Sequence, residues 1–235
     1  MNNGENKNDD KIYYEYQRKY IDFIEAEKYN QSFKLKSSYD YFNIKKLIGF
    51  LVAKREQNCV FKLLFAVGPI QSVLDVPCGT GKLIKDLLNN VKTEVIGIDA
   101  SEAMLLKIET RDNRLKLITA DIDNIPLDND FVDLTICHRF LHRMSPENVK
   151  LIMKEIYRVS KEYAIFYFAV KGPLTNFTQK IEKLLRIGDS KDIFYMTKKN
   201  IKDQVIACGW DSIKEKSVLP MGISTGYLIL VKKRK

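Results

Sequence analysis

The chain has 235 residues, of which 45% are hydrophobic and 29% charged, as in an ordinary globular protein. This length suits one domain of mixed architecture with a sizeable core, and the composition excludes a mainly disordered chain. The net charge of +9 is carried mostly by Lys spread through nearly every segment. That pattern is typical of solvated faces and disfavours an Arg-rich surface that binds nucleic acid.

The cysteines and the apolar runs limit the possible compartments. Cys59, Cys78, Cys137 and Cys208 are far apart and form no C-x-x-C pair, which excludes a zinc ribbon and a disulfide framework. No signal-peptide pattern opens the chain, and its apolar runs are far shorter than the roughly 20 residues that span a bilayer. We therefore expect a cytoplasmic protein without a membrane span.

The first segments predict a helical cover. Residues 1–10 are almost wholly polar and are expected to be disordered, whereas residues 11–66 are predicted to form an N-terminal helical lid. Aromatic side chains at helical spacing come first, and Ser38 can cap a helix that ends at "VGP", residues 67–69. The apolar stripe predicted for this helix is Ile44, Leu47, Ile48 and Leu51.

A repeated pattern of strand, turn and helix fills residues 67–170, the predicted cofactor-binding core. The strands are expected at 72–76, 93–99, 115–121, 131–137 and 163–170, and the helices at 82–91, 101–109 and 145–160. Ser101 and Ser145 are the expected N-caps of the last two helices. Strands that alternate with helices at this spacing predict right-handed crossovers and a parallel, doubly wound sheet.

The last third departs from this pattern. Residues 171–197 are expected to form a substrate-covering insertion, and 198–235 a helix followed by a hairpin of strands 211–219 and 226–233. Residues 11–235 are therefore predicted to be a single α/β domain. Its sheet is seven-stranded, mostly parallel and Rossmann-like, with a reversed last strand and the helical lid.

The glycine-rich loop "DVPCGTGK" excludes two phosphate-binding motifs. A P-loop would have glycine at Val76 and a hydroxyl residue at Leu83. A dinucleotide fingerprint would have its third glycine at Ile84. The loop instead follows an acidic residue, Asp75, which suits a ligand that brings an ammonium group close to the backbone at Gly79.

Two further acids stand at successive strand ends. The carboxylate of Asp99 can accept both hydroxyls of a ribose, and Asp121 can accept a hydrogen bond from the amine of adenine. Ile122 and Met104 would provide apolar contact to the ring. Ammonium, ribose and adenine in this order describe S-adenosylmethionine.

Four ordered motifs then carry a family resemblance. "VLDVPCGTGKL", "GIDASEAML", "ADIDNIPLDNDFVDLTICHRFLHRM" and "EIYRVSK" together resemble the class I S-adenosylmethionine-dependent methyltransferases, especially the small-molecule enzymes related to those of quinone biosynthesis. The resemblance covers roughly residues 70–170 and implies S-adenosyl-L-methionine as cofactor. The cofactor-binding residues that it implies are Asp75, Pro77, Cys78, Gly79, Thr80, Gly81, Asp99, Ala100, Met104, Asp121, Ile122, Cys137 and His138.

Both histidines of the chain lie in "CHRFLHRM", residues 137–144. A metal site is disfavoured, because Arg139 follows His138 where a protease motif has Glu and no further ligands stand nearby. They could simply be hydrogen-bonded core residues at a strand end. Imidazole titrates near neutral pH, so the catalytic hypothesis makes His142 the base and His138 a pocket or cofactor contact, with either assignment open.

The predicted function is methyl transfer from S-adenosylmethionine to an O, N or S nucleophile of a small molecule, by in-line displacement. Aromatic side chains of the lid and the insertion are expected to line the substrate pocket: Tyr16, Tyr20, Tyr29, Phe33, Phe177 and Phe194. An RNA-modifying methyltransferase is an alternative, although "CHRF" stands where an N-P-P-Y-type motif would be. A non-catalytic cofactor-binding subunit of the same fold is the other.

Overall fold

The computed structural model describes residues 39–170, 193–219 and 226–234, and the side chains of its first helix from residue 49 onward. The segment predicted to be disordered, most of the predicted lid and most of the predicted insertion lie outside these residues. The same holds for five of the six aromatic residues expected in the substrate pocket: Tyr16, Tyr20, Tyr29, Phe33 and Phe177.

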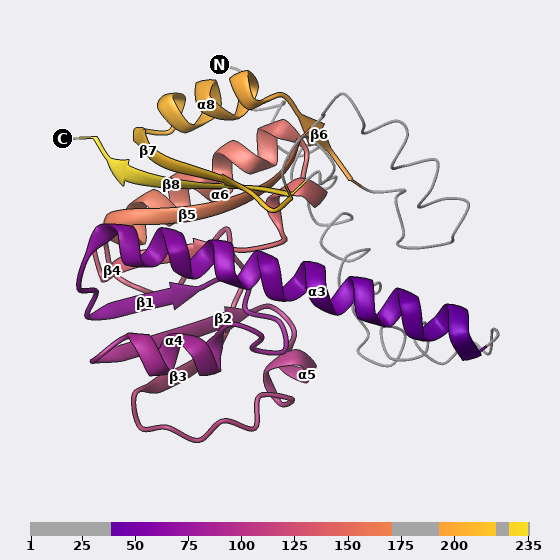
Figure 1. Ribbon diagram of the computed structural model, residues 1–235. Helices are drawn as coiled ribbons and strands as arrows, with labels where there is room; N and C mark the ends of the chain where they lie inside the picture. Colours follow the sequence, from indigo (N-terminus) through magenta and orange to yellow (C-terminus); the bar gives the residue numbers. More distant parts are fainter. Residues whose placement is uncertain (1–38, 171–192, 220–225, 235) are drawn as a thin grey trace, which may run out of the picture.

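A single mixed sheet organises the fold (Figure 1). Its strand order is β3-β2-β1-β4-β5-β8-β7, and β6 pairs with β5 off this path. The strands are β1 Ser72–Asp75, β2 Glu94–Asp99, β3 Leu115–Thr119, β4 Val132–Cys137, β5 Ser160–Val170, β6 Tyr195–Met196, β7 Trp210–Ser217 and β8 Gly226–Lys233. The predicted doubly wound sheet is confirmed, with the two-residue β6 as one short strand more than expected.

One strand runs against the others. Strands β1 to β6 pair in parallel, whereas β8 is antiparallel to both of its neighbours, β5 and β7. The predicted hairpin is therefore confirmed, and its two strands take different places. Strand β7 forms the edge, and β8 lies between β5 and β7.

Two apolar layers cover the two faces of the sheet, because successive side chains of a strand point to opposite sides. Val73 and Ile165 pack with helices α3 Tyr39–Leu64 and α4 Ile84–Asn90. Their chain neighbours Leu74 and Phe166 pack in the other layer, with α6 Pro146–Val159 and α8 Lys198–Ala207. In Figure 1, α3 crosses the face that α4 also covers.

The long helix α3 ends where predicted, but its buried face differs from the predicted apolar stripe. It continues into a short 3-10 turn, Phe65–Val67, and ends before Gly68, as predicted. Leu51, however, is 55% exposed, and the buried face of α3 lies further along, at Val60, Leu63 and Leu64. The predicted stripe failed at Leu51 because the C-terminal half of the helix is the part that packs on β5, β7 and β8.

The other helices follow their predicted signals with one exception. Ser145 caps α6, because its Oγ accepts a hydrogen bond from the backbone N–H of Asn148. The apolar face of α6 is buried at Val149, Ile152, Met153, Ile156 and Val159. The helix after β2 is only α5, Glu102–Leu105, and the Ser101 side chain makes no cap. Its backbone N–H instead donates to Asp99, which draws the turn toward the sheet.

Across the described ranges, no helix combines the length and the apolar character that crossing a bilayer requires.

Candidate active site

The glycine loop lies at the carboxyl end of β1, where ligands bind in open parallel sheets. Its backbone continues the pairing of the sheet: the N–H of Val76 donates to Ile136 O, and that of Cys78 to Ile98 O. Gly79 adopts a φ of +55°, and a Cβ on it would meet nothing within 4 Å. The loop is therefore anchored at its start and leaves open space over Gly79.

Asp75 ends β1 as a buried acid and is 2% exposed. Burial, together with the nearby charge of Asp99, raises its pKa to about 8 from the usual 3.8. No positive charge among the described residues opposes this rise, so the position fits a ligand that brings one.

Asp99 ends β2 and holds two turns together. Its Oδ2 accepts a hydrogen bond from the N–H of Gly79 at 2.8 Å, and its Oδ1 one from the N–H of Ser101 at 2.9 Å. Burial raises its pKa, and these two hydrogen bonds oppose that rise. Each carboxylate oxygen has a second lone pair, so Asp99 can still accept a pair of ribose hydroxyls.

Asp121 follows β3 on a more open loop. Burial raises the pKa of its carboxyl, as do the charges of Asp123 and Asp99. The neighbouring Ile122 is buried, as is Met104 of α5, whereas Asp121 is exposed. This arrangement fits a flat ring: the apolar side chains would contact its faces, and the carboxyl of Asp121 would accept a hydrogen bond from its edge.

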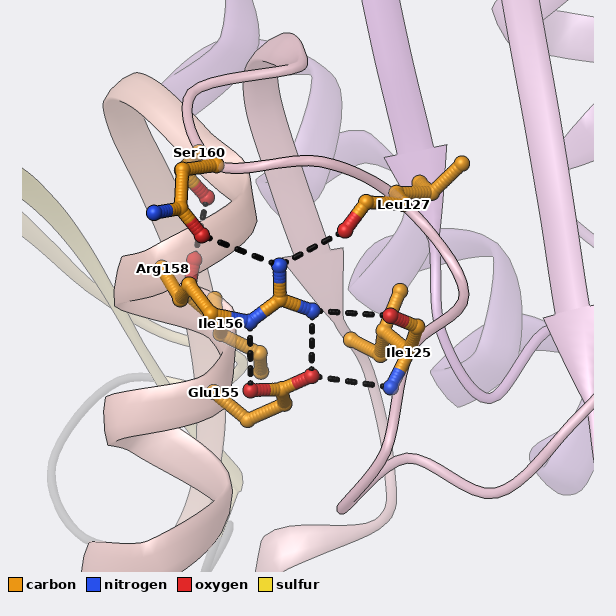
Figure 2. A network of polar contacts seen from close by, with 7 residues as sticks. Ile125, Leu127, Glu155, Ile156, Arg158 and Ser160 are labelled. Atoms are coloured by element: carbon orange, nitrogen blue, oxygen red, sulfur yellow. Dashed lines mark hydrogen bonds and ion pairs between the residues drawn. The ribbon is translucent and has the colours of Figure 1, made fainter.

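A network of polar contacts fixes the loop that carries Asp121 (Figure 2). The guanidinium of Arg158 donates to the Ile125 and Leu127 carbonyls at 2.7 and 2.6 Å, and to both oxygens of Glu155. Glu155 Oε1 also accepts the Ile125 N–H at 2.8 Å. The "EIYRVSK" motif thus ties the end of α6 to the segment between β3 and β4.

The two histidines follow β4 and meet on one aromatic ring. His138 comes directly after Cys137, and His142 lies in the short helix η2, Leu141–Arg143. Both imidazole rings contact the Tyr167 ring of β5 edge-on, with centroids 5.3 Å away. Phe194, predicted for the substrate pocket, is half-buried, and its backbone N–H donates to His142 O at 2.7 Å.

A buried acid that the sequence analysis missed completes this cluster. Glu56 of α3 is 3% exposed, and its Oε1 accepts a hydrogen bond from the Tyr167 hydroxyl at 3.3 Å. Its Oε2 lies 3.2 Å from Arg139 Nε and 3.8 Å from His138 Nε2. Helix α3 therefore contributes an acid to a site whose other residues come from the carboxyl ends of strands.

Burial decides the charge of this cluster. It lowers the pKa of both imidazoles to about 3, with help from the positive charge of Arg139. Burial also raises the pKa of Glu56 and Tyr167. Both histidines are therefore neutral near pH 7, and an imidazole with so low a pKa holds a proton only if a negative charge lies close by.

The remaining predicted cofactor residues lie around the same edge. Cys78 and Cys137 are buried, and burial raises the pKa of both thiols. Pro77, Gly81 and Ala100 are partly buried, whereas Thr80 is exposed. In the part of the chain that the structure describes, no three His, Cys, Asp or Glu side chains form a group that could hold a metal ion.

Comparison with known protein families and sequences finds methyltransferases among the similar proteins. Residues 73–163 match the family described as a methyltransferase domain. The malonyl-[acyl-carrier protein] O-methyltransferase of Hamiltonella defensa is 26% identical over 136 residues, 56% of this chain and 52% of that protein. An uncharacterized methyltransferase of Schizosaccharomyces pombe is 29% identical over 97 residues, 41% of this chain and 38% of that protein. The chain spans about a third to a half of the length of such curated relatives.

Solved structures share the fold at low identity. The magnesium protoporphyrin IX methyltransferase of Synechocystis PCC 6803, solved with bound S-adenosylhomocysteine, superposes with a TM-score of 0.69 at 16% identity and covers 90% of this chain and 97% of that chain. A methyltransferase of Methanosarcina mazei superposes with a TM-score of 0.57 at 17% identity, over 70% of this chain and 93% of that chain.

The sheet order is that of an α/β domain of the methyltransferase type, and residues 73–163 match that domain. The fold is shared with a methyltransferase solved with bound S-adenosylmethionine and with bound S-adenosylhomocysteine. Two observations of this structure fit S-adenosylmethionine, namely the buried Asp75 carboxyl and the open space over Gly79.

Proposed function

We propose that this protein transfers the methyl group of S-adenosylmethionine to a nucleophile of a small molecule. The observation that carries the proposal is the buried Asp75 carboxyl, which no cation of the described residues neutralises, beside the open glycine loop. Bound S-adenosylmethionine supplies a methyl group on a sulfonium, which displacement turns into a neutral leaving group. The chain needs only to hold the acceptor in line, exclude water and accept a proton where the acceptor has one.

The roles of the residues follow their places at the strand ends. Asp75 would pair with the ammonium of the methionine part, Asp99 would accept the ribose hydroxyls, and Asp121 the adenine amine. Cys137 and His138, at the end of β4, would border the reacting methyl group. Phe194 lies beside His142 and would belong to the pocket of the acceptor.

Two similar proteins support a small-molecule acceptor. One is named for magnesium protoporphyrin IX and the other for malonyl-[acyl-carrier protein], the latter as an O-methyltransferase. We extend only the general class, a small or carrier-bound organic acceptor, to this chain. The relation to quinone-biosynthesis enzymes and the cytoplasmic location stay predictions from the sequence.

Calorimetry with S-adenosylhomocysteine tests the first half of the proposal. The wild-type chain should bind it, and Asp75→Asn should weaken binding at least tenfold, because the ammonium loses its only acidic partner at the β1 end. The matched control Asp211→Asn changes an exposed acid on β7, far from the strand ends of the core, and should bind like wild type. No binding by the wild-type chain would overturn the proposal.

Methyl transfer to a natural mixture tests the second half. With S-adenosylmethionine labelled on its methyl group, label should move into the small-molecule fraction of a cell extract and not into its total RNA. The net charge of +9 favours the RNA alternative, so binding to total RNA should be titrated with salt in parallel. Label in RNA alone would favour the modifying enzyme, and cofactor binding without label in either fraction would favour a non-catalytic subunit.

A further inference from the structure

Three buried polar atoms gather where α3 crosses the carboxyl ends of β4 and β5. Within the described residues, Glu56 Oε2, His138 Nε2 and His142 Nδ1 are buried and make no hydrogen bond. All three belong to residues that contact Tyr167. Glu56 Oε2 has an ion-pair partner in Arg139, whereas the two imidazole nitrogens make no hydrogen bond with described residues. Buried polar atoms are rarely left without a hydrogen bond, so this group calls for a functional explanation.

Packing does not explain an acid at Glu56. The neighbours on its face of α3, Val60 and Leu63, are fully buried apolar residues, and a leucine would continue that face at lower desolvation cost. The Arg139 ion pair and the Tyr167 hydroxyl offset part of the cost of burial. Oε2, the oxygen that pairs with Arg139, also lies 3.8 Å from His138 Nε2.

The two histidines differ in this respect. Among the described residues, His138 is the only histidine with an acid within 4 Å. The positive charges of Arg139, His142 and Lys82 act on His138 as well, and those of Arg143 and Arg139 act on His142. A proton taken up by His138 would place a positive charge beside Glu56. The same proton on His142 would meet positive charge alone.

The cluster borders the cofactor loop. In the sheet, Asp75 lies level with Ile136, so His138 leaves β4 just beyond the level of the Asp75 carboxylate. The glycine-loop residue Lys82 exerts its charge on both Glu56 and His138, and its carbonyl accepts a hydrogen bond from Gln57 Nε2 at 3.1 Å. Helix α3 therefore places Glu56 beside the loop that would hold the methionine part.

We propose that Glu56 is a positioning residue for His138, and that this pair makes His138 the base that takes the proton from a hydroxyl acceptor. The proposal rests on the methyltransferase function proposed above. The Glu56 carboxylate faces Nε2 and favours the tautomer with its proton there, which leaves Nδ1 free to accept. The sequence led to a preference for His142 with either assignment open. Glu56 is distant in the chain, so the sequence did not link it to His138.

The proposed methyl transfer to the hydroxyl is a displacement at the methyl carbon. An oxygen lone pair of the acceptor forms a bond to the methyl carbon, the carbon–sulfur bond breaks, and its electron pair stays on sulfur. The hydroxyl proton moves to His138, and the carboxylate of Glu56 balances the imidazolium charge. The products are a methyl ether, a neutral thioether and a proton that later leaves to solvent. A hydroxyl that ionises only weakly is the acceptor class that needs such a pair.

Histidine NMR gives a test that needs no acceptor. The chain has two histidines, so ¹⁵N-histidine labelling yields two imidazole patterns, which His142→Gln assigns. With S-adenosylhomocysteine bound at pH 7.5, His138 should hold its proton on Nε2. Glu56→Leu should shift His138 toward the Nδ1–H tautomer and leave His142 unchanged. The matched control Glu94→Gln, an acid at the opposite end of the sheet, should change neither pattern.

An unchanged His138 tautomer in Glu56→Leu would overturn the proposal, whether or not methyl transfer is found. Failure of S-adenosylhomocysteine to bind to wild type would instead overturn the proposed function, which separates the two. Should Glu56→Leu not fold, Glu56→Gln replaces it, and its uncharged amide should likewise weaken the Nε2–H preference.

Activity gives the second readout, as label transferred to the small-molecule extract. Glu56→Gln should slow transfer about a hundredfold with unchanged affinity for S-adenosylhomocysteine, and His138→Gln should lose more than His142→Gln. The loss in Glu56→Gln should shrink as rising pH ionises the acceptor, an effect that a purely structural role would not produce. A pH-independent loss would contradict the pairing. The charged and titratable groups that face His138 are Glu56, Lys82, Arg139, His142 and Tyr167.

Discussion

Asp75 is the residue whose protonation should respond most directly to the cofactor. Its pKa is about 8 in the unliganded chain, and a neighbouring ammonium would lower it. Cofactor binding near pH 7 should therefore release close to one proton. The affinity for S-adenosylhomocysteine should rise up to about tenfold per pH unit between pH 6 and 8. Calorimetry in two buffers of different ionisation enthalpy measures both effects.

The Asp75 carboxyl also makes the stability of the cofactor-free chain depend on pH. A folded-state pKa raised from 3.8 to about 8 contributes stability below pH 4 that is lost as the pH rises through 8. Asp75→Asn should remove that loss and raise the free energy of unfolding at pH 8 by about 1–3 kcal/mol. A variant that is less stable than wild type at pH 8 would mean that Asp75 has a partner in the unliganded state.

Gly79 and Gly81 should respond differently to alanine. Both have positive φ, but a Cβ on Gly79 meets nothing within 4 Å, whereas one on Gly81 would lie 2.9 Å from a side-chain carbon of Ile108. Gly79→Ala should cost about 1–2 kcal/mol of stability from backbone strain and at least tenfold in cofactor affinity, since its methyl group enters the open space. Gly81→Ala should cost more stability. Thermal unfolding and calorimetry separate the two effects.

Among single residues, the sequence predicts the candidate cofactor-binding acids but not the contribution of Glu56. Asp75, Asp99 and Asp121 could be found because each follows a recognisable strand. Glu56 could not, because its partners come from β4 and β5, far along the chain. The available signal was an acid on the apolar face that Val60 and Leu63 share. The left-handed backbone of Arg139, φ 57°, which turns the chain between the histidines, has no sequence signature.

Among the elements, the end of α6 does more than cover the sheet. Arg158 and Glu155 hold the backbone of the Ile125–Leu127 segment through contacts of 2.6 to 2.9 Å (Figure 2). Arg158→Ala frees this segment and leaves two carbonyls without their donor. We expect a loss of about 1–2 kcal/mol in stability and a several-fold weaker affinity for S-adenosylhomocysteine, through the loop of Asp121.

A matched variant tests whether this effect is local. Arg234→Ala removes another arginine that pairs with an acid, Asp211, at an exposed place. It should change stability by less than about 0.5 kcal/mol and leave cofactor affinity unchanged. Equal losses in the two variants would show that the Arg158 contacts are no more than surface ion pairs. Chemical denaturation and calorimetry give both quantities.

Element prediction failed where tertiary contacts overrode local signals. Helix α6 has a cap, a proline and an apolar stripe that agree, and it was predicted nearly to the residue. Helix α5 spans only four residues, and Ser101 before it makes no side-chain cap and donates its N–H to Asp99. The short β6 exists because it pairs with β5, which no pattern in two residues can reveal.

For the whole molecule, Trp210 joins the C-terminal hairpin to the core. It is fully buried, its ring packs edge-on against Tyr157 and Phe166, and its indole N–H donates to Met153 O at 3.4 Å. Trp210→Ala should cost about 3–5 kcal/mol, whereas alanine at the exposed Leu151 should cost less than about 0.5 kcal/mol. Urea unfolding followed by circular dichroism measures both, and a small loss for Trp210→Ala would show that the hairpin is only loosely joined.

The place of β8 also matters while the chain is being made. Strand β5 is apolar on both faces, and its free edge is closed by β8, which is synthesised only after α8 and β7. At about 5–20 residues per second, the ribosome leaves this edge open for several seconds. During that interval this edge of β5 has no strand of the same chain to pair with. We expect chaperones, or β8 of a neighbouring nascent chain, to bind this edge before the chain's own β8 is synthesised.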